Sequence, residues 1–259
     1  MSAFIIFGIL IGFIFLGVPV CFSIAYSGIG YILSSQAQPL ILIAQRSLNG
    51  MDNYTLLAIP LFTLAGFIMD KGGLSKRLVA FLERAFFWIP GGIGTITVLC
   101  CAVFGALTGS GPGTVAAIGA ITYPAMKQAG YRENSAAGLL ACGGALGPVI
   151  PPSICMIVYG TTFGVSVPAM FMAAVVPGLL MALFLIVTNI FVCKRQNVAQ
   201  VKKSYTLREI WMSFTKSWGV LLLPIVVLGG IYGGIFTPTE ASADMLQAGN
   251  RRADGHRPR

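Results

Sequence analysis

Long apolar stretches alternate with short charged segments along this 259-residue chain. No Asp, Glu, Lys or Arg occurs from Met1 to Gln45, from Ala85 to Met126, or from Asn134 to Cys193. About 20 apolar residues are enough to cross a hydrocarbon core roughly 30 Å thick. Because a helix satisfies its own backbone hydrogen bonds within the bilayer, these continuous runs predict membrane-spanning helices rather than the alternating strands of a barrel.

The first apolar run is interrupted by Pro19, which breaks or kinks a helix. We predict two short helices, Ala3–Leu16 and Pro19–Leu33, with one kinked and tilted helix as the alternative. A polar link, Ser34–Asn53, follows. The first residues, Met1–Ile11, have no basic segment and therefore do not resemble a cleavable signal peptide.

The next segment, Tyr54–Met69, is predicted to be a span that ends at a charged, glycine-rich turn. In Leu74–Trp88 the apolar residues recur at helical spacing, and Lys76 and Arg77 are among the charged residues between them. This pattern predicts an amphipathic helix in the membrane interface, on the cytoplasmic side because of its basic residues.

Two apolar arms, Ile93–Leu107 and Val115–Met126, flank the glycine-rich segment Thr108–Thr114. Each arm would extend only about 18–23 Å as a helix, which is less than the hydrocarbon core. We therefore predict a re-entrant hairpin that enters and leaves on one face. Lys127 and Arg132 indicate that this face is cytoplasmic.

A second irregular segment, Gly147–Ser153, follows the short helix predicted over Asn134–Leu146. Its three prolines cannot lie in a regular helix interior, so we predict one span that is unwound near its middle. Further spans are predicted over Val167–Val192 and Trp218–Phe236.

Composition agrees with a membrane protein: 56% of the residues are hydrophobic and 10% are charged, against about 25% charged in soluble proteins. The net charge of +9 could indicate nucleic-acid binding. The favoured explanation is the excess of basic residues that membrane proteins carry in their cytoplasmic loops. The six cysteines lie in or beside apolar spans and the one histidine is His256, so no metal site is expected. The basic residues gather between two spans, at Lys194, Arg195, Lys202, Lys203, Arg208 and Lys216.

The two Gly/Pro/Ser-rich segments are the strongest functional signal. Irregular backbone at membrane depth is tolerated only where it is buried or lines a cavity. Transporters use such breaks to present carbonyls to Na⁺ and helix N-termini to anionic substrates. Ser110, Thr114 and Ser153 would add hydroxyl groups. The alternative is a pair of proline kinks that only shape packing.

An enzymatic function of the first segment, Thr108–Thr114, has less support. It lacks the Gly-Lys-Ser/Thr of a phosphate loop, and no histidine or lysine in the apolar region could activate Ser110 as a nucleophile. No acidic residue lies near either segment, which favours a weakly bound monovalent cation over Ca²⁺. An anion could be held by helix N-termini near Gly113, Thr114 or Ser153.

Four motifs carry a family resemblance: IPLFTLAG at 59–66, ALTGSGPGT at 106–114, GGALGPVIPPS at 143–153 and TPTE at 237–240. With their order, over about residues 1–243, the chain resembles the large permease (DctM-type) subunit of tripartite ATP-independent periplasmic (TRAP) transporters. The resemblance implies sodium-driven uptake of C4-dicarboxylates or related organic acids across a bacterial inner membrane. It implies no cofactor apart from Na⁺ as the coupling ion.

The resemblance also implies partners and a fold. The partners are a small permease subunit (DctQ-type), a periplasmic solute-binding protein (DctP-type) and membrane lipids, with no nucleic acid. The fold is an all-α polytopic membrane protein, the first inverted repeat of an elevator-type transporter with a re-entrant helical hairpin and a discontinuous transmembrane helix. The implied sodium ligands are Ser110, Gly111, Thr114, Gly147, Pro148 and Ser153, and the implied substrate contacts are Thr108, Gly113, Pro151 and Pro152.

The expected organisation has eight parts: N-terminal scaffold helices (1–53), a scaffold span and arm helix (54–92), the hairpin (93–127), the broken helix (133–166), a span (167–193), a basic cytoplasmic loop (194–217), the start of a second repeat (218–243) and a tail unlike the family (244–259). We interpret this tail as a truncation or frameshift, with a natural basic tail as the alternative. A truncated, non-transporting structural membrane subunit is the alternative function. A channel is disfavoured because no charged ring or repeated filter loop is visible.

Overall fold

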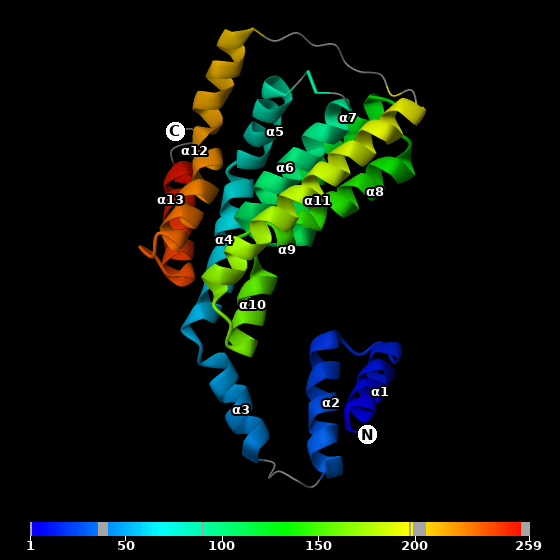
Figure 1. The fold of residues 1–259 in the computed structure, drawn as a ribbon, viewed down its shortest axis with the longest axis vertical. Helices are drawn as coiled ribbons and strands as arrows, with labels where there is room; N and C mark the ends of the chain where they lie inside the picture. Colours follow the sequence, from blue (N-terminus) through cyan, green and yellow to red (C-terminus); the bar gives the residue numbers. More distant parts are fainter. Residues whose placement is uncertain are drawn as a thin grey trace. The chain divides into compact units, whose positions relative to one another are not determined.

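A computed structural model of the chain describes residues 2–35, 41–86, 88–89, 91–196, 198 and 206–254. Within these residues the secondary structure is helical, as the sequence predicts (Figure 1). The chain divides into two compact units, residues 1–53 and residues 54–259. Lys202, Lys203 and tail residues 255–259 lie outside the described residues.

The first unit contains α1 (Ser2–Phe15), α2 (Val20–Ser35) and α3 (Ile41–Met51). Two separate helices at the N-terminus confirm the favoured prediction. They pack as a pair, with the rings of Phe13 and Tyr26 5.4 Å apart. The segment predicted to be a polar link instead contains α3. The apolar start, Ile41–Ala44, and the absence of proline from Ile41–Met51 allow this helix to form.

The second unit begins with a 3₁₀ turn, η1 (Tyr54–Leu57), which leads into α4 (Ala58–Lys71) and then α5 (Leu74–Ala85). The apolar face of α5 is buried, and the protein itself covers it. α5 packs against α6 (Gly92–Thr108) and α12 (Leu207–Tyr232), and the ring of Phe81 lies 5.8 Å from that of Phe214 in α12. The helix predicted to lie in the membrane interface therefore buries its apolar face against other helices of the protein. Its depth relative to a membrane stays a prediction.

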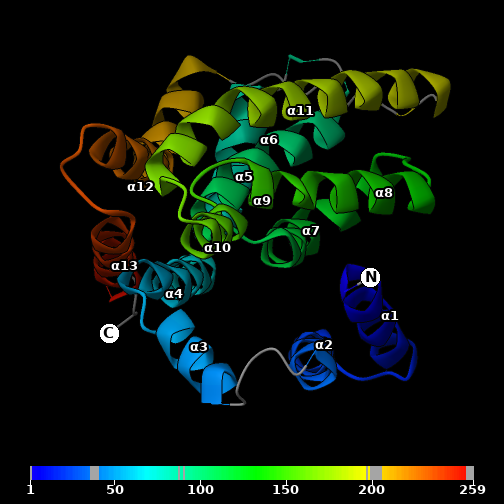
Figure 2. The same cartoon turned by 60° about the horizontal axis from the view of Figure 1, so that its bottom comes forward.

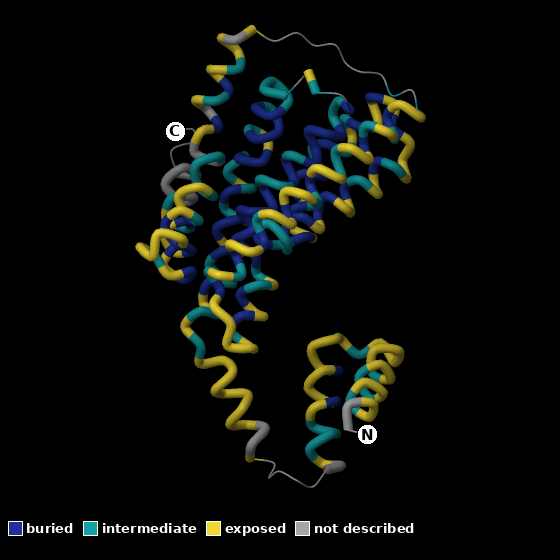
Figure 3. Tube along the Cα trace, in the orientation of Figure 1, coloured by how far each residue is buried: buried dark blue, intermediate teal, exposed yellow. Residues whose placement is uncertain are grey.

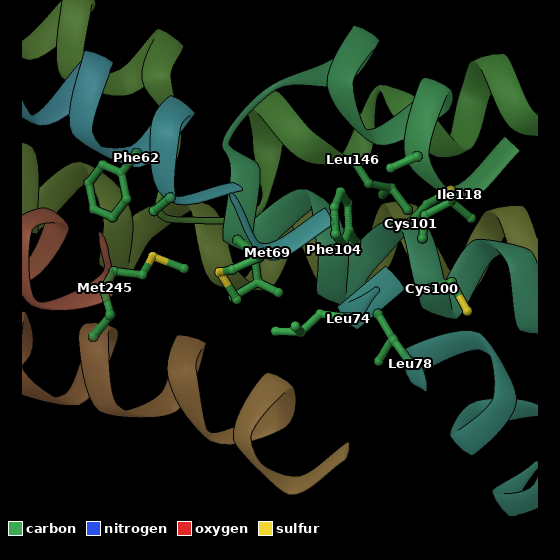
Figure 4. Close-up of a cluster of buried hydrophobic side chains, with 14 of the residues drawn as sticks. Phe62, Met69, Leu74, Leu78, Cys100, Cys101, Phe104, Ile118, Leu146 and Met245 are labelled. Atoms are coloured by element: carbon green, nitrogen blue, oxygen red, sulfur yellow. The ribbon is translucent and has the colours of Figure 1, made fainter. Parts of the chain in front are cut away.

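The centre of this unit is formed by α6 (Gly92–Thr108), α7 (Gly111–Gln128), α8 (Glu133–Gly144) and α11 (Val167–Gln196), which lie side by side in Figures 1 and 2. Two short helices, α9 (Leu146–Val149) and α10 (Ile154–Phe163), connect α8 to α11. The hydrophobic core lies around α6. It includes Cys100 and Phe104 of this helix and Leu146 of α9 (Figure 4).

The last two helices are α12 (Leu207–Tyr232) and α13 (Pro238–Asp254). α12 begins inside the segment predicted to be a loop, because Glu209 accepts a hydrogen bond from the backbone N–H of Thr206 and caps the helix start. It also ends before Phe236, since the chain turns at Gly233 and Gly234 and the N–H of Phe236 donates back to Gly230.

α13 packs along α4 and continues without interruption across the expected boundary between residues 243 and 244. Met245 is fully buried and belongs to the same apolar cluster as Phe62 and Met69 of α4 (Figure 4). Thr239 Oγ1 donates to the carbonyl of Tyr54 at 3.1 Å. The segment expected to start a tail therefore begins as a packed helix.

Among the described residues, two segments are long and apolar enough to cross a membrane, Tyr54–Lys71 and Val167–Gln196. The pair Glu133–Val149 and Ile154–Phe163, bent by 41°, makes a third if it is one span. The predicted span near the end is shorter than expected, with Leu221–Tyr232 as its apolar part. Exposed residues run along α11 (Figure 3). They include large apolar ones, as on a helix that faces lipid: Val176, Leu179, Leu183, Phe184, Val187 and Phe191.

Candidate functional site

The tip of the α6–α7 hairpin is tighter than the sequence predicts. Only Gly109 and Ser110 separate the two helices, whereas the whole segment Thr108–Thr114 was expected to be irregular. Gly109 adopts a left-handed conformation (φ 61°) and ends α6. Ser110 is extended and caps α7, accepting a 3.4 Å hydrogen bond from the N–H of Gly113. Pro112 is tolerated because the first helical turn needs no N–H from it.

Two buried threonine hydroxyls connect the ends of the hairpin arms. Thr108 Oγ1 and Thr114 Oγ1 are 3.1 Å apart. Thr114 Oγ1 donates to the carbonyl of Ser110 at 2.7 Å, and Thr108 Oγ1 lies 3.2 Å from the carbonyl of Phe104. Thr108, implied as a substrate contact, therefore belongs to the same hydroxyl network as Thr114, implied as a sodium ligand.

The break in the second motif is also shorter than predicted. Leu146–Val149 still forms a helical turn, α9, which contains Pro148 in its first turn, where a proline is tolerated. The chain is extended at Ile150 and at Ser153, and Ser153 caps α10. Its hydroxyl donates to the carbonyl of Pro148 at 2.6 Å and accepts from the N–H of Met156 at 3.4 Å. Ser153 is fully buried.

The hairpin tip and the helix break are in contact. A Cβ on Gly147 would lie 2.9 Å from the carbonyl oxygen of Ser110 and 3.2 Å from the nitrogen of Gly111. A Cβ on Gly109 would lie 3.0 Å from the carbonyl oxygen of Pro152. Such distances leave no room for a side chain, so glycine is required for this approach.

The structure thus brings the ten candidate residues into one region, in different roles. The contact itself is made by Ser110, Gly111, Gly147 and Pro152. Pro148 lies beside Gly111: a Cβ on Gly111 would be 3.6 Å from the ring carbons Cγ and Cδ of Pro148. Thr108, Thr114 and Ser153 reach the contact through hydrogen bonds. Gly113 is exposed on the first turn of α7, and Pro151 is buried next to Pro152.

The available chemistry is that of neutral oxygens and helix ends. The carbonyl of Pro148 accepts the hydroxyl proton of Ser153 and has a second lone pair for another partner. The carbonyl of Ser110 accepts both the hydroxyl and the backbone N–H of Thr114. α7 and α10 both begin in this region, and the N–H groups at their N-termini carry partial positive charge. In the described part of the chain no group of three or more His, Cys, Asp or Glu residues could hold a metal ion.

A buried polar cluster away from the tip was not anticipated. The hydroxyl of Tyr131 lies 2.8 Å from the carbonyl oxygen of Gly91, 3.0 Å from Asn189 Oδ1 and 2.7 Å from Cys193 Sγ, and its one proton can be donated to either oxygen. Asn189 Nδ2 donates to Thr95 Oγ1 at 3.1 Å. The sequence feature that could have predicted this cluster is Asn189, an amide side chain in an otherwise apolar span. A buried polar group of this kind needs a hydrogen-bond partner.

Beside this cluster, the α7–α8 connection carries an exposed ion pair between Lys127 and Glu133. The hydrogen bond from Lys127 lowers the pKa of the Glu133 carboxyl below its ordinary value. The same hydrogen bond raises the pKa of the Lys127 ammonium.

Comparison with known proteins gives a consistent relationship. The profile of the family "Tripartite ATP-independent periplasmic transporter, DctM component" matches residues 7–245. A 2,3-diketo-L-gulonate TRAP transporter large permease of Escherichia coli K12 is 40% identical over 94% of this chain and 57% of its own length. A C4-dicarboxylate TRAP transporter large permease of Vibrio cholerae is 41% identical over 94% of this chain and 54% of its own length.

A sialic acid TRAP transporter large permease of Vibrio cholerae is 34% identical over 92% of this chain and 55% of its own length. The chain therefore spans about half the length of the curated relatives it matches. These relatives are transport proteins rather than enzymes, in agreement with the expectation from the sequence. With a family profile covering most of its length and several relatives above 30% identity, the chain belongs to the DctM component family of tripartite ATP-independent periplasmic transporters.

Proposed function

We propose that the hairpin tip and the helix break form a sodium site in a permease for organic acids. The observation that carries this proposal is the contact in which Gly147 lies against the carbonyl of Ser110 and the nitrogen of Gly111. Two irregular segments, distant in sequence, present carbonyls and hydroxyls to one place without any acidic side chain. Such a neutral oxygen set suits a weakly bound monovalent cation.

In this proposal the carbonyl of Pro148 and the hydroxyl oxygens of Thr114 and Ser153 coordinate Na⁺, and the carbonyl of Ser110 orients the Thr114 hydroxyl through a hydrogen bond. Gly111 and Gly147 permit the close approach. The N-termini of α7 and α10 attract a carboxylate, since helix N-termini favour negative charge. Gly113 on the exposed first turn of α7, together with Pro151 and Pro152, forms the side nearest to that anion; Thr108 serves the hydroxyl network instead.

The names of the relatives support the substrate class. Diketogulonate, C4-dicarboxylates and sialic acid all carry a carboxylate group. We propose an organic acid as the substrate, and a DctQ-type small permease and a DctP-type binding protein as partners, in a bacterial inner membrane. In the elevator mechanism that we propose, the hairpin and the broken helix move as one body, which their direct contact favours.

The experiment that tests the sodium site measures the unfolding midpoint of the detergent-purified chain in NaCl and in KCl at equal ionic strength. A ligand that binds only the folded state raises the midpoint with its concentration. We expect a rise specific to Na⁺ that Thr114→Val reduces and that the exposed Thr162→Val in α10 leaves unchanged. Equal midpoints in NaCl and KCl for the unmodified chain would sink the proposal.

A structural subunit without a pathway is the competing function, and one observation favours it. Every buried side-chain nitrogen and oxygen in the described residues already has a hydrogen-bond partner within the protein. On this hypothesis Ser153→Ala lowers stability equally in NaCl and KCl. Uptake of an organic acid by proteoliposomes with the two partner subunits would then show no dependence on this site.

A further inference from the structure

α4 passes directly over the hairpin tip, and its residue at the crossing is Gly66. This residue is buried, between the buried side chains of Ala65 and Met69 on the same helix. An ideal Cβ on Gly66 would lie 2.8 Å from Thr108 Cγ2 and 3.3 Å from Thr108 Cα. Because a backbone atom is also within 3.3 Å, a change of rotamer alone does not make room for a side chain at this position.

The methyl group that faces Gly66 shares its Cβ with the hydroxyl that faces Thr114. Thr108 Oγ1 is 3.1 Å from Thr114 Oγ1 and 3.4 Å from the backbone nitrogen of Ser110. A β-branched side chain has few allowed χ1 rotamers, so its methyl and hydroxyl move together. Pressure on Cγ2 from α4 must therefore rotate the hydroxyl away from Thr114 or shift the end of α6.

We infer that Gly66 is a positioning residue: the missing side chain on α4 lets Thr108 hold its hydroxyl against Thr114 at the hairpin tip. The inference rests on the proposed sodium site and adds to it a residue from a helix that carries none of the candidate ligands. Gly66 acts through Thr108 and Thr114, which in turn bonds the carbonyl of Ser110 at 2.7 Å.

A double-mutant cycle on the detergent-purified chain tests the inference, with Gly66→Ala, Thr108→Ser and the double variant. Serine keeps the hydroxyl and removes Cγ2, the atom nearest to the added Cβ. Sodium affinity is obtained from the unfolding midpoint in NaCl relative to KCl at equal ionic strength. Gly138→Ala in α8 is the matched control, since its Cβ meets nothing within 4 Å and it brings the same gain in helix propensity.

We expect Gly66→Ala to weaken sodium binding by roughly threefold or more in the unmodified background and by less in the Thr108→Ser background. Gly138→Ala leaves the affinity unchanged. Equal weakening in both backgrounds, or none in either, overturns the positioning role. Should the unmodified chain not respond to sodium, the proposed site fails, and the midpoints in KCl decide the inference: coupled effects of Gly66→Ala and Thr108→Ser uphold it, and additive effects overturn it.

Discussion

Thr114 shows how a single buried hydroxyl connects two parts of the hairpin. It is fully buried, it donates to the carbonyl of Ser110 at 2.7 Å, and it lies 3.1 Å from the hydroxyl of Thr108. The sequence identified Thr114 and Ser110 as candidates from their hydroxyl groups. It did not pair Thr108 with Thr114, because that pairing depends on the left-handed turn at Gly109, which returns the chain over itself.

Replacing Thr114 by valine keeps the shape and removes the hydroxyl. We expect the free energy of unfolding to fall by about 0.5–1.5 kcal/mol, because the carbonyl of Ser110 and the hydroxyl of Thr108 each lose one hydrogen bond and keep another. Chemical denaturation in detergent measures the change. Thr162→Val, an exposed threonine in α10, is the control, and a loss of the same size there would contradict the assignment.

The ion pair between Lys127 and Glu133 predicts a pH dependence. The lowered pKa of Glu133 means that its contribution to stability is present above the ordinary carboxyl pKa and is lost as the pH falls through the lowered value. The raised pKa of Lys127 means that its contribution is present below the ordinary ammonium pKa and is lost as the pH rises through the raised value.

We therefore expect the unfolding midpoint of the unmodified chain to exceed that of Glu133→Gln only between these two limits. The difference should be small and should shrink in high salt, because both side chains are exposed. Thermal unfolding of both proteins from acidic to alkaline pH provides the measurement. A difference that does not vary with pH would argue against the pair.

At the scale of elements, the hairpin α6–α7 and the interrupted helix α8–α9–α10 meet through glycine. The sequence predicted both elements from apolar runs around Gly/Pro/Ser-rich segments. It overestimated both irregular segments, since Pro112 and Pro148 occupy first turns of helices, where no N–H is needed. It also missed α3, a short helix in a segment free of proline, and the early start of α12, which follows from local capping at Thr206.

Gly147→Ala tests the contact between these elements. The added Cβ would be 2.9 Å from the carbonyl oxygen of Ser110, so the hairpin tip or α9 must move. We expect the free energy of unfolding to decrease by about 1–3 kcal/mol, the usual range for overpacking. Circular dichroism follows the unfolding of this variant and of the control Gly138→Ala. The control should be neutral or slightly stabilising, because its Cβ meets nothing within 4 Å. Equal effects of the two substitutions would show that the contact is not tight.

At the scale of the whole molecule, a polar cluster connects elements that the sequence treated separately. Asn189 of α11 donates to the carbonyl of Gly91 at the start of α6 at 3.1 Å and to Thr95 Oγ1 at 3.1 Å. Tyr131, in the α7–α8 connection, bonds the same carbonyl and Asn189 itself. The cluster therefore holds both arms of the hairpin to α11 at the end opposite the tip.

Asn189→Ala removes the shared partner of this cluster. We expect a loss of about 1–3 kcal/mol in the free energy of unfolding for each buried group left without a hydrogen bond. Denaturant titration of the purified chain measures it, and Asn134→Ala, exposed in α8, provides the control. If the two variants unfold alike, Asn189 does not hold the helices together.

The sequence by itself determined that this chain is a helical membrane protein of the DctM component family, because long uncharged runs and four linear motifs are local properties. It also located both irregular segments. Only the tertiary structure decided that Ser110 lies against Gly147, that Gly66 lies against Thr108 and that Asn189 joins Tyr131. These pairs are far apart in sequence or depend on a turn, and their distances are set by how helices pack, which no linear pattern encodes.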